Sequence, residues 1–188
     1  MKILAVLGSP RRGGNTEVLL DRLLAGATDA GAEVEKAWLG DLSIHPMCDW
    51  TACKEAGGPC TAPDDAFKLM ERMAGADVIL LATPLYWFGP SSQLKTFIDR
   101  WACLSDAEHE RLHGKKGFLV HVRAGSNPAS AEPLVAMIGW SFRYLKIDFV
   151  GEVSGIAYRR GEMAGDQLAL ETAGAWGRRL ARGDIPGY

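Results

Sequence analysis

Apolar and polar residues follow one another along the chain in blocks that predict alternating strands and helices. Nearly continuous apolar runs predict buried parallel strands at 3–7, 77–83 and 117–124. A more charged run at 33–39 suits an edge strand, and 148–158 completes a set of five. Apolar residues at helical spacing predict intervening helices over 16–30, 64–74, 91–103 and 130–145, and a closing helix striped by Ala169, Ala173, Trp176 and Leu180.

Strands separated by helices, without a hairpin signal, predict an α/β fold: a doubly wound, five-stranded parallel sheet of order 2-1-3-4-5 with helices on both faces. We expect residues 1–188 to form a single domain, interrupted by an insert at about 45–63, with 104–116 as a loop. In such a sheet a ligand binds beyond the carboxyl ends of the strands, where the winding reverses. The loop after Leu7 should therefore lie beside the loop after Ala82.

Composition narrows the class of protein. Of the 188 residues, 47% are hydrophobic and 23% are charged, as in ordinary globular domains. A net charge of −2 gives no indication of a nucleic-acid partner. No apolar run approaches the ~20 residues of a membrane span. The residues before Gly8 do not resemble a signal peptide. We therefore expect a cytoplasmic protein, without a membrane partner, whose cysteines are reduced.

The first strand ends in a turn suited to an anion, Gly8-Ser-Pro-Arg-Arg-Gly-Gly-Asn-Thr16. Free backbone N–H groups and the helix dipole favour negative charge where the helix begins, and Asn15 or Thr16 is positioned to cap it. The hydroxyls of Ser9 and Thr16, the amide of Asn15 and the guanidinium groups of Arg11 and Arg12 all suit a phosphate. The alternative is an ordinary strand–helix turn with two solvated arginines.

Two common phosphate motifs are absent from this turn. Gly13 is followed by Gly14 and Asn15, so the lysine of a P-loop is missing. Pro10 stands where a dinucleotide fingerprint has its second glycine. What remains is a site for a terminal phosphomonoester, and flavin mononucleotide (FMN) is a cofactor of that kind.

The loop after the third strand carries three consecutive aromatic residues, Tyr86, Trp87 and Phe88, between Pro84 and the pair Gly89-Pro90. Aromatic side chains at the end of a strand are costly to leave in water. They should cover a flat ligand, meet another subunit, or cap the core. Beside a phosphate turn, a platform for an isoalloxazine ring is the favoured interpretation.

Three motifs together resemble the NADPH-dependent FMN reductase family of flavodoxin-like proteins, and its iron–sulfur flavoprotein branch in particular. They are the turn Gly8–Thr16, the run Ala76-Asp-Val-Ile-Leu-Leu-Ala-Thr-Pro-Leu-Tyr-Trp-Phe-Gly89, and Leu94-Lys-Thr-Phe-Ile-Asp-Arg100. The resemblance covers nearly the whole chain. It implies non-covalently bound FMN, a homodimer or homotetramer, and NAD(P)H-driven reduction of flavin, quinone, azo or nitro compounds as small-molecule acceptors.

The resemblance also assigns site residues. It implies that the phosphate is held by Ser9, Arg11, Asn15 and Thr16. It implies that the isoalloxazine is lined by Pro84, Leu85, Tyr86, Trp87, Phe88 and Gly89, and approached by Gly125 and Ser126. Asp99 and Arg100 are expected to anchor a helix and the dimer surface. No catalytic side chain is expected, because in flavin enzymes the cofactor carries the chemistry.

Three cysteines lie close together in the insert, Cys48, Cys53 and Cys60. Aligned with the compact cysteine run of the iron–sulfur branch, only Cys53 and Cys60 match, and Met47 and Trp50 replace two ligands. A [4Fe–4S] cluster needs four ligands, normally thiolates, so we expect neither a cluster nor a metal. The favoured interpretation is a structural remnant in which two of the cysteines can form a disulfide. The alternative to it and to a cluster is a zinc site made of His45 and the three cysteines.

The sequence is also compatible with two other functions. A flavodoxin-like electron carrier would work with a protein redox partner, although such carriers tend to be strongly acidic and this chain is not. A regulatory protein could use FMN as a structural ligand. Fold alone does not separate these functions from an oxidoreductase.

Overall fold

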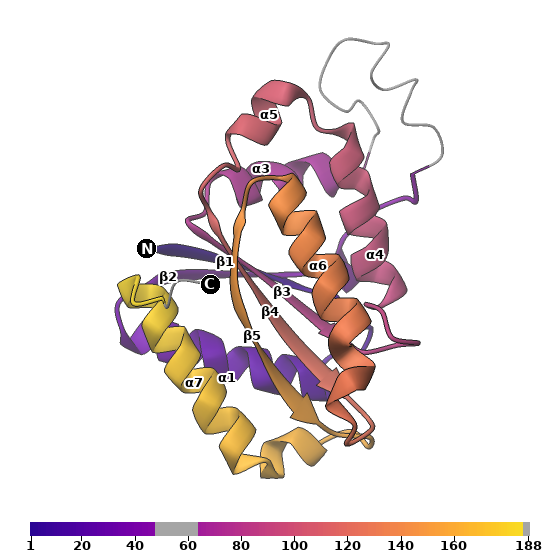
Figure 1. The fold of residues 1–188 in the computed structure, drawn as a ribbon, viewed down its shortest axis with the longest axis vertical. Coiled ribbons are helices and arrows are strands. Elements are labelled where there is room, and N and C mark those ends of the chain that lie inside the picture. Colours follow the sequence, from indigo (N-terminus) through magenta and orange to yellow (C-terminus); the bar gives the residue numbers. More distant parts are fainter. Residues whose placement is uncertain (48–63, 186–188) are drawn as a thin grey trace.

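The computed structural model describes residues 1–47 and 64–185. Its centre is a five-stranded parallel sheet of order β2-β1-β3-β4-β5, as predicted (Figure 1). The strands are β1 (Lys2–Leu7), β2 (Glu33–Trp38), β3 (Val78–Pro84), β4 (Lys116–Arg123) and β5 (Asp148–Ile156). This order makes β2 and β5 the edges and puts the winding reversal between β1 and β3.

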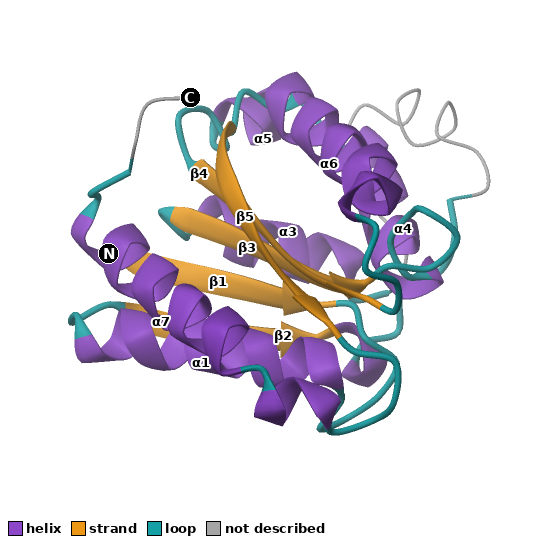
Figure 2. Cartoon of the chain, turned by 60° about the horizontal axis from the view of Figure 1, so that its bottom comes forward, coloured by secondary structure: helices purple, strands orange, loops and turns teal. Residues whose placement is uncertain are grey.

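Helices cover both faces of the sheet (Figure 2). The α-helices are α1 (Asn15–Asp29), α3 (Ala66–Ala74), α4 (Ser92–Asp99), α5 (Asp106–Glu110), α6 (Glu132–Tyr144) and α7 (Gln167–Arg182). Short 3-10 turns are η1 (Leu39–Asp41), η2 (Arg100–Cys103), η3 (Pro128–Ala131) and η4 (Glu162–Gly165). Helices α1 and α7 enclose one apolar core against the sheet, and α3, α4 and α6 enclose the other. The fold is flavodoxin-like.

Burial follows the sequence pattern that predicted it. Ile3 to Leu7 of β1 and Val78 to Ala82 of β3 are fully buried, because these central strands are covered on both faces. The apolar stripe of α1 from Leu19 to Ala27 is buried, whereas most of β2 is at least partly exposed at its edge of the sheet.

Helices α1 and α7 approach each other closely through glycines. A Cβ atom at Gly177 would lie 2.0 Å from the carbonyl oxygen of Leu23, and one at Gly26 would lie 2.2 Å from that of Gly174. A side chain at either position would force the two helices apart. This contact fixes α7, the last of the described elements, against α1.

Two predicted elements differ from the structure. Residues 104–116, expected as a loop, contain α5, whose Ser105 and Glu108 form a capping box. The helix expected over 91–103 ends as α4 at Asp99 and continues as η2. The apolar stripe of Leu94, Phe97, Ile98 and Trp101 is nevertheless buried as expected.

Within the residues that the structure describes, no helix is long and apolar enough to cross a lipid bilayer.

Candidate functional site

The loops that follow β1 and β3 are joined at the carboxyl edge of the sheet. The backbone N–H of Gly8 donates to the carbonyl of Ala82 at 2.8 Å. The hydroxyl of Ser91, which is fully buried at the start of α4, donates to the carbonyl of Gly8 at 2.5 Å and accepts from the N–H of Leu94 at 3.2 Å. A Cβ atom at Gly8 would lie 2.7 Å from that of Leu94, so this junction excludes a side chain at Gly8. Ser91 thus links the two loops that the sequence singled out.

The turn between β1 and α1 offers free hydrogen-bond donors. Among the described residues, the backbone N–H groups of Asn15, Thr16 and Glu17 have no acceptor, as is usual for the first turn of a helix. Thr16 is 2% exposed, and its hydroxyl makes no hydrogen bond within the described part of the chain. Three backbone donors and one hydroxyl at the positive end of a 15-residue helix can bind a phosphate.

The prediction that Asn15 or Thr16 caps α1 is wrong. The N-cap residue is Gly14, and no side chain caps the helix. The Asn15 amide instead binds the loop between β5 and η4: it donates to the carbonyl of Arg159 at 2.8 Å and accepts from the N–H groups of Gly161 at 3.0 Å and Met163 at 3.3 Å. Any part of Asn15 in phosphate binding therefore falls to its backbone N–H.

The arginines of the turn differ in their surroundings. Arg12 pairs with Asp41, and its guanidinium lies 3.7 Å from the centre of the Trp38 ring. Trp38 in turn donates from its indole nitrogen to the carbonyl of Ser9 at 2.6 Å. Arg11 is exposed and makes no ion pair with any described residue. Arg12 therefore stabilises the turn, whereas the charge of Arg11 is available to bind an anion.

Ser9 supports the turn from within. It is buried, and its hydroxyl accepts from the N–H of Arg11 at 3.2 Å. Gly13, with φ of +59°, adopts the left-handed conformation that glycine tolerates best, and its N–H donates to the Glu17 carboxylate at 2.6 Å. The shape of the turn is therefore set by contacts within it.

The aromatic loop is a tight two-residue hairpin. Tyr86 and Gly89 exchange two backbone hydrogen bonds of 2.9 Å, and the two residues between them, Trp87 and Phe88, have φ of +49° and +65°. Two consecutive left-handed residues define a type I′ turn, which normally takes Asn-Gly. Bulky side chains in this conformation cost of order 1–3 kcal/mol each. Backbone strain of this kind concentrates at functional sites.

The hairpin presents its aromatic side chains to solvent. Trp87 is 94% exposed, and Tyr86 and Phe88 are about half exposed. Its base is fixed: the N–H of Leu85 donates to the carbonyl of Val122 at 2.8 Å, and the Thr83 hydroxyl accepts from the N–H of Ser91 at 2.9 Å. Among the predicted ring-lining residues, Pro84 and Leu85 are therefore partly buried in this base, and Tyr86 to Phe88 form an exposed aromatic surface.

The third loop of this edge follows β4. Gly125 and Ser126 are exposed at its tip. Arg123, the last residue of β4, donates to the Ser154 hydroxyl at 3.1 Å, and its buried Nε has no partner among the described residues. Arg123 was predicted only as a candidate for the phosphate of NADPH, and Ser91 and Trp38 were not predicted at all. The available signals were a serine at the start of α4 and a tryptophan at the end of β2.

The predicted cysteine site lies largely outside the described residues, because Cys48, Cys53 and Cys60 are not among them. The residues on either side of this segment are bonded to one another. The buried Arg100 guanidinium binds the Asp64 carboxylate and the carbonyl of His45, while Asp64 accepts from the N–H of His45. Arg100 thus anchors a helix as expected, but it is buried and does not belong to an open surface.

Burial by itself would raise the pKa of Asp64. Hydrogen bonds from Arg100 and from the N–H groups of His45 and Ala66 outweigh that effect and hold this pKa below its usual value. Asp64 therefore remains a carboxylate that ties the two ends of the segment together.

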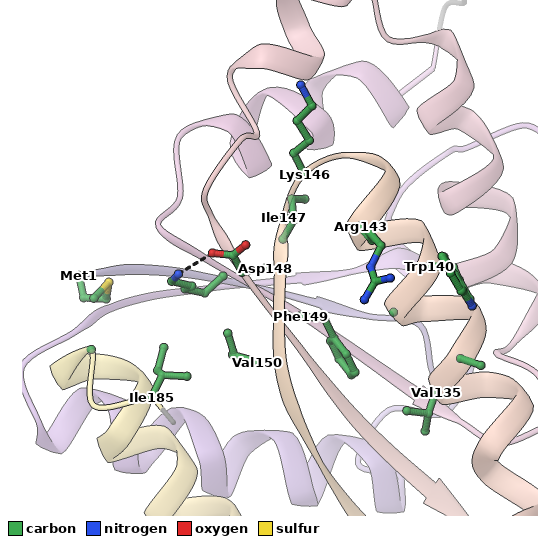
Figure 3. Close-up of a pocket in the computed structure, with 14 residues that line it drawn as sticks. Met1, Val135, Trp140, Arg143, Lys146, Ile147, Asp148, Phe149, Val150 and Ile185 are labelled. Carbon is green, nitrogen blue, oxygen red and sulfur yellow. Dashed lines mark hydrogen bonds and ion pairs between the residues drawn. The ribbon is translucent and has the colours of Figure 1, made fainter. Parts of the chain in front are cut away.

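A separate groove of about 950 Å³ lies along β5, between α6 and the chain termini (Figure 3). Its strand residues are Lys116 and Asp148 to Val150, at the amino ends of β4 and β5. None of the predicted site residues lines it. Since ligands of doubly wound sheets bind at the carboxyl ends of the strands, we do not assign this groove to the site above.

Comparison with known proteins gives a consistent result. The model of the family described as NADPH-dependent FMN reductase matches residues 1–145. The Bacillus subtilis protein YwqN, which is named provisionally as an NAD(P)H-dependent FMN-containing oxidoreductase, is 33% identical over 98% of this chain and 99% of its own. An iron–sulfur flavoprotein of Methanocaldococcus jannaschii is 32% identical over 96% of both chains. The solved NAD(P)H:quinone oxidoreductase from Methanothermobacter marburgensis superposes with a TM-score of 0.78 over 96% of both chains at 19% identity, which supports the fold.

Proposed function

Because the chain belongs to the NADPH-dependent FMN reductase family, whose members are flavin-dependent NAD(P)H oxidoreductases, we propose that it reduces flavin, quinone, azo or nitro compounds with NAD(P)H in a ping-pong reaction. The observation that carries the proposal is the junction at the carboxyl edge of the sheet. There the free donors of α1 and the strained aromatic hairpin are joined through Gly8, Ala82 and Ser91.

The residues present fit FMN. Among the described residues, the N–H groups of Asn15 to Glu17 and the hydroxyl of the buried Thr16 have no partner, so they offer a phosphomonoester four donors, and Arg11 offers a positive charge. The aromatic surface of the hairpin suits a flat ring system. Bound FMN supplies hydride and electron transfer.

The protein's own part in this reaction is to bind, orient and shield. The amino-terminal end of α1 binds the phosphate. The hairpin and the loop at Gly125 and Ser126 orient the isoalloxazine ring. Arg123 ends β4 as a cation with no carboxylate within ion-pair distance among the described residues. A positive charge beside the ring favours its anionic reduced form.

The nicotinamide and the acceptor would occupy the same open ring face in turn, so no second nucleotide-binding fold is needed. Exposed aromatic side chains at this face favour flat acceptors, and quinone reduction is the activity in the name of the Methanothermobacter marburgensis protein. Arg159 and Arg160 lie beside the phosphate turn and are candidates for the extra phosphate of NADPH.

Steady-state kinetics of the FMN-loaded protein test this proposal. NADH or NADPH is varied against FMN, a benzoquinone, an azo dye and a nitroarene, and oxidation of the nicotinamide is recorded. We expect turnover with at least one acceptor and parallel double-reciprocal lines. Bound FMN without turnover for any acceptor would instead support an electron carrier or a regulatory flavoprotein.

A further inference from the structure

A mainly apolar hollow of about 620 Å³ lies between α4, α5 and α6. Its residues come from the carboxyl-terminal halves of α4 and α6, from η2 and α5, and from Met47. Helix α4 begins at the carboxyl edge of the sheet, where Ser91 binds Gly8, and α6 follows the end of β4. The hollow therefore lies at the other end of these helices from the proposed FMN site, and none of the residues assigned to FMN lines it.

Two residues of the hollow bury a nitrogen atom that has no hydrogen-bond partner. Trp101 is 4% exposed, and its indole Nε1 has no partner among the described residues. The same is true of Nε2 of His109, which α5 contributes. Buried polar groups are nearly always hydrogen-bonded, so an unpaired one requires an explanation. In the described part of the chain four buried side-chain atoms lack a partner, and two of them belong to residues of this hollow.

The walls of the hollow are largely aromatic. They include the rings of Trp101, His109, Trp140 and Tyr144. The His109 and Tyr144 rings meet edge to face with their centres 6.1 Å apart, and the Trp101 ring packs against two phenylalanines of the core. Trp140 and Tyr144 are 66% and 78% exposed, so a molecule can enter from solvent. A hollow of this volume with aromatic walls and few polar atoms is typical of a site for a small, flat molecule.

The polar atoms and charges define the chemistry of that molecule. An indole N–H can only donate, so the ligand must carry an acceptor, whereas an imidazole nitrogen can donate or accept. Asp99 is the one charged side chain among the described residues that line the hollow, and α5 adds three carboxylates nearby. These negative charges disfavour a carboxylate or phosphate ligand. An uncharged ring system with a carbonyl oxygen meets both requirements.

We propose that this hollow is a second binding site, separate from the FMN site, and that it takes a neutral, flat aromatic ketone. The ketone oxygen accepts from the indole of Trp101 and from the imidazole of His109, and the ring system lies between the aromatic walls. Binding supplies the partner that each buried nitrogen lacks. The proposal rests on the hollow alone and does not depend on the proposed function.

A matched pair of compounds provides the test. Chromone, a bicyclic aromatic ketone, and naphthalene, a hydrocarbon of similar size, are titrated separately into isotope-labelled, FMN-loaded protein. The indole N–H resonances of the six tryptophans are followed by NMR, and that of Trp101 is identified by its loss in Trp101→Phe. We expect chromone to move this resonance downfield in a saturable manner, because the indole gains an acceptor. Chromone should bind Trp101→Phe and His109→Phe about threefold to tenfold more weakly than the wild type, and naphthalene should bind all three proteins alike.

The choice of variants separates binding from folding. Trp176→Phe on α7 is the matched control, since it makes the same change on the other face of the sheet and should keep the wild-type affinity for chromone. His109 is only partly buried, so His109→Phe preserves the test should Trp101→Phe fail to fold. A Trp101 resonance that chromone leaves unmoved, a preference for chromone over naphthalene that survives both substitutions, or a hollow that binds neither compound would each overturn the proposal.

Discussion

The hydroxyl of Thr16 is a sensitive probe of the proposed phosphate site because it has no partner within the described part of the chain. Thr16→Val keeps the shape of the side chain and removes one donor. We expect FMN affinity to fall roughly tenfold, because a hydrogen bond to a charged group is worth about 1.5–3 kcal/mol. Fluorescence titration measures the change. Thr16→Ser is the matched control, and riboflavin, which lacks the phosphate, should bind both variants equally.

Asn15 is a structural residue in this site. Its amide makes three hydrogen bonds to residues 159–163, so Asn15→Ala should lower the free energy of unfolding by about 1–3 kcal/mol. Asn15→Asp keeps an acceptor for Gly161 and Met163 and should cost less. Urea denaturation of the FMN-free protein measures both losses. Equal stability of the alanine variant and the wild type would contradict this role.

The strained hairpin is the element in which stability and binding oppose each other. Replacing Trp87-Phe88 by Asn-Gly supplies the residues that a type I′ turn prefers. The free energy of unfolding of the FMN-free protein should rise by about 1–3 kcal/mol, while the affinity for FMN and the kcat/KM for quinones should fall. A variant that gains stability and keeps both binding and turnover would show that the aromatic pair has no part in the site.

The buried ion pair between Asp64 and Arg100 should make the stability of the protein depend on pH. The pKa of Asp64 is lowered in the folded protein, so its contribution is complete above the unfolded pKa of about 4 and is lost as pH falls through the folded value. Asp64→Asn removes the carboxylate opposite a buried guanidinium and should cost about 3–5 kcal/mol at neutral pH. Urea denaturation from pH 7 to pH 3 should therefore show the difference between wild type and variant shrinking in acid.

These elements also show what the sequence can predict. The strand order followed from right-handed crossovers and from the edge-like composition of β2. The buried stripes of α1 and α4 followed from apolar periodicity, because that pattern records burial directly. The cap of α1 was mispredicted because the partners of Asn15 lie more than 140 residues away. The hairpin was not anticipated because Trp-Phe is unfavourable in its turn. Pairing of Leu85 with β4 and the link through Ser91 impose that geometry. In contrast, the capping box of α5 could be read in Ser105 and Glu108.

For the whole molecule, the main chemical question is the metal content. The chain has four cysteines, so a four-thiolate cluster would need every one of them, including Cys103, which is buried in η2. We expect anaerobically purified protein to show flavin absorption bands without a broad brown shoulder, and iron well below four atoms per chain. Stoichiometric iron and acid-labile sulfide would reverse this expectation and place the chain with its iron–sulfur relatives in cofactor content as well as in sequence.

The close contact between α1 and α7 has a consequence for how the protein is made. During synthesis the amino-terminal part of a chain emerges and begins to fold first. The apolar stripe of α1 then has no α7 to cover it, and Asn15 lacks the loop that binds its amide, until residues 159–182 have left the ribosome. The turn between β1 and α1 therefore reaches its final form only after these residues have been made. A chain that stops at residue 145 would expose the side of α1 that faces α7 to chaperones and proteases.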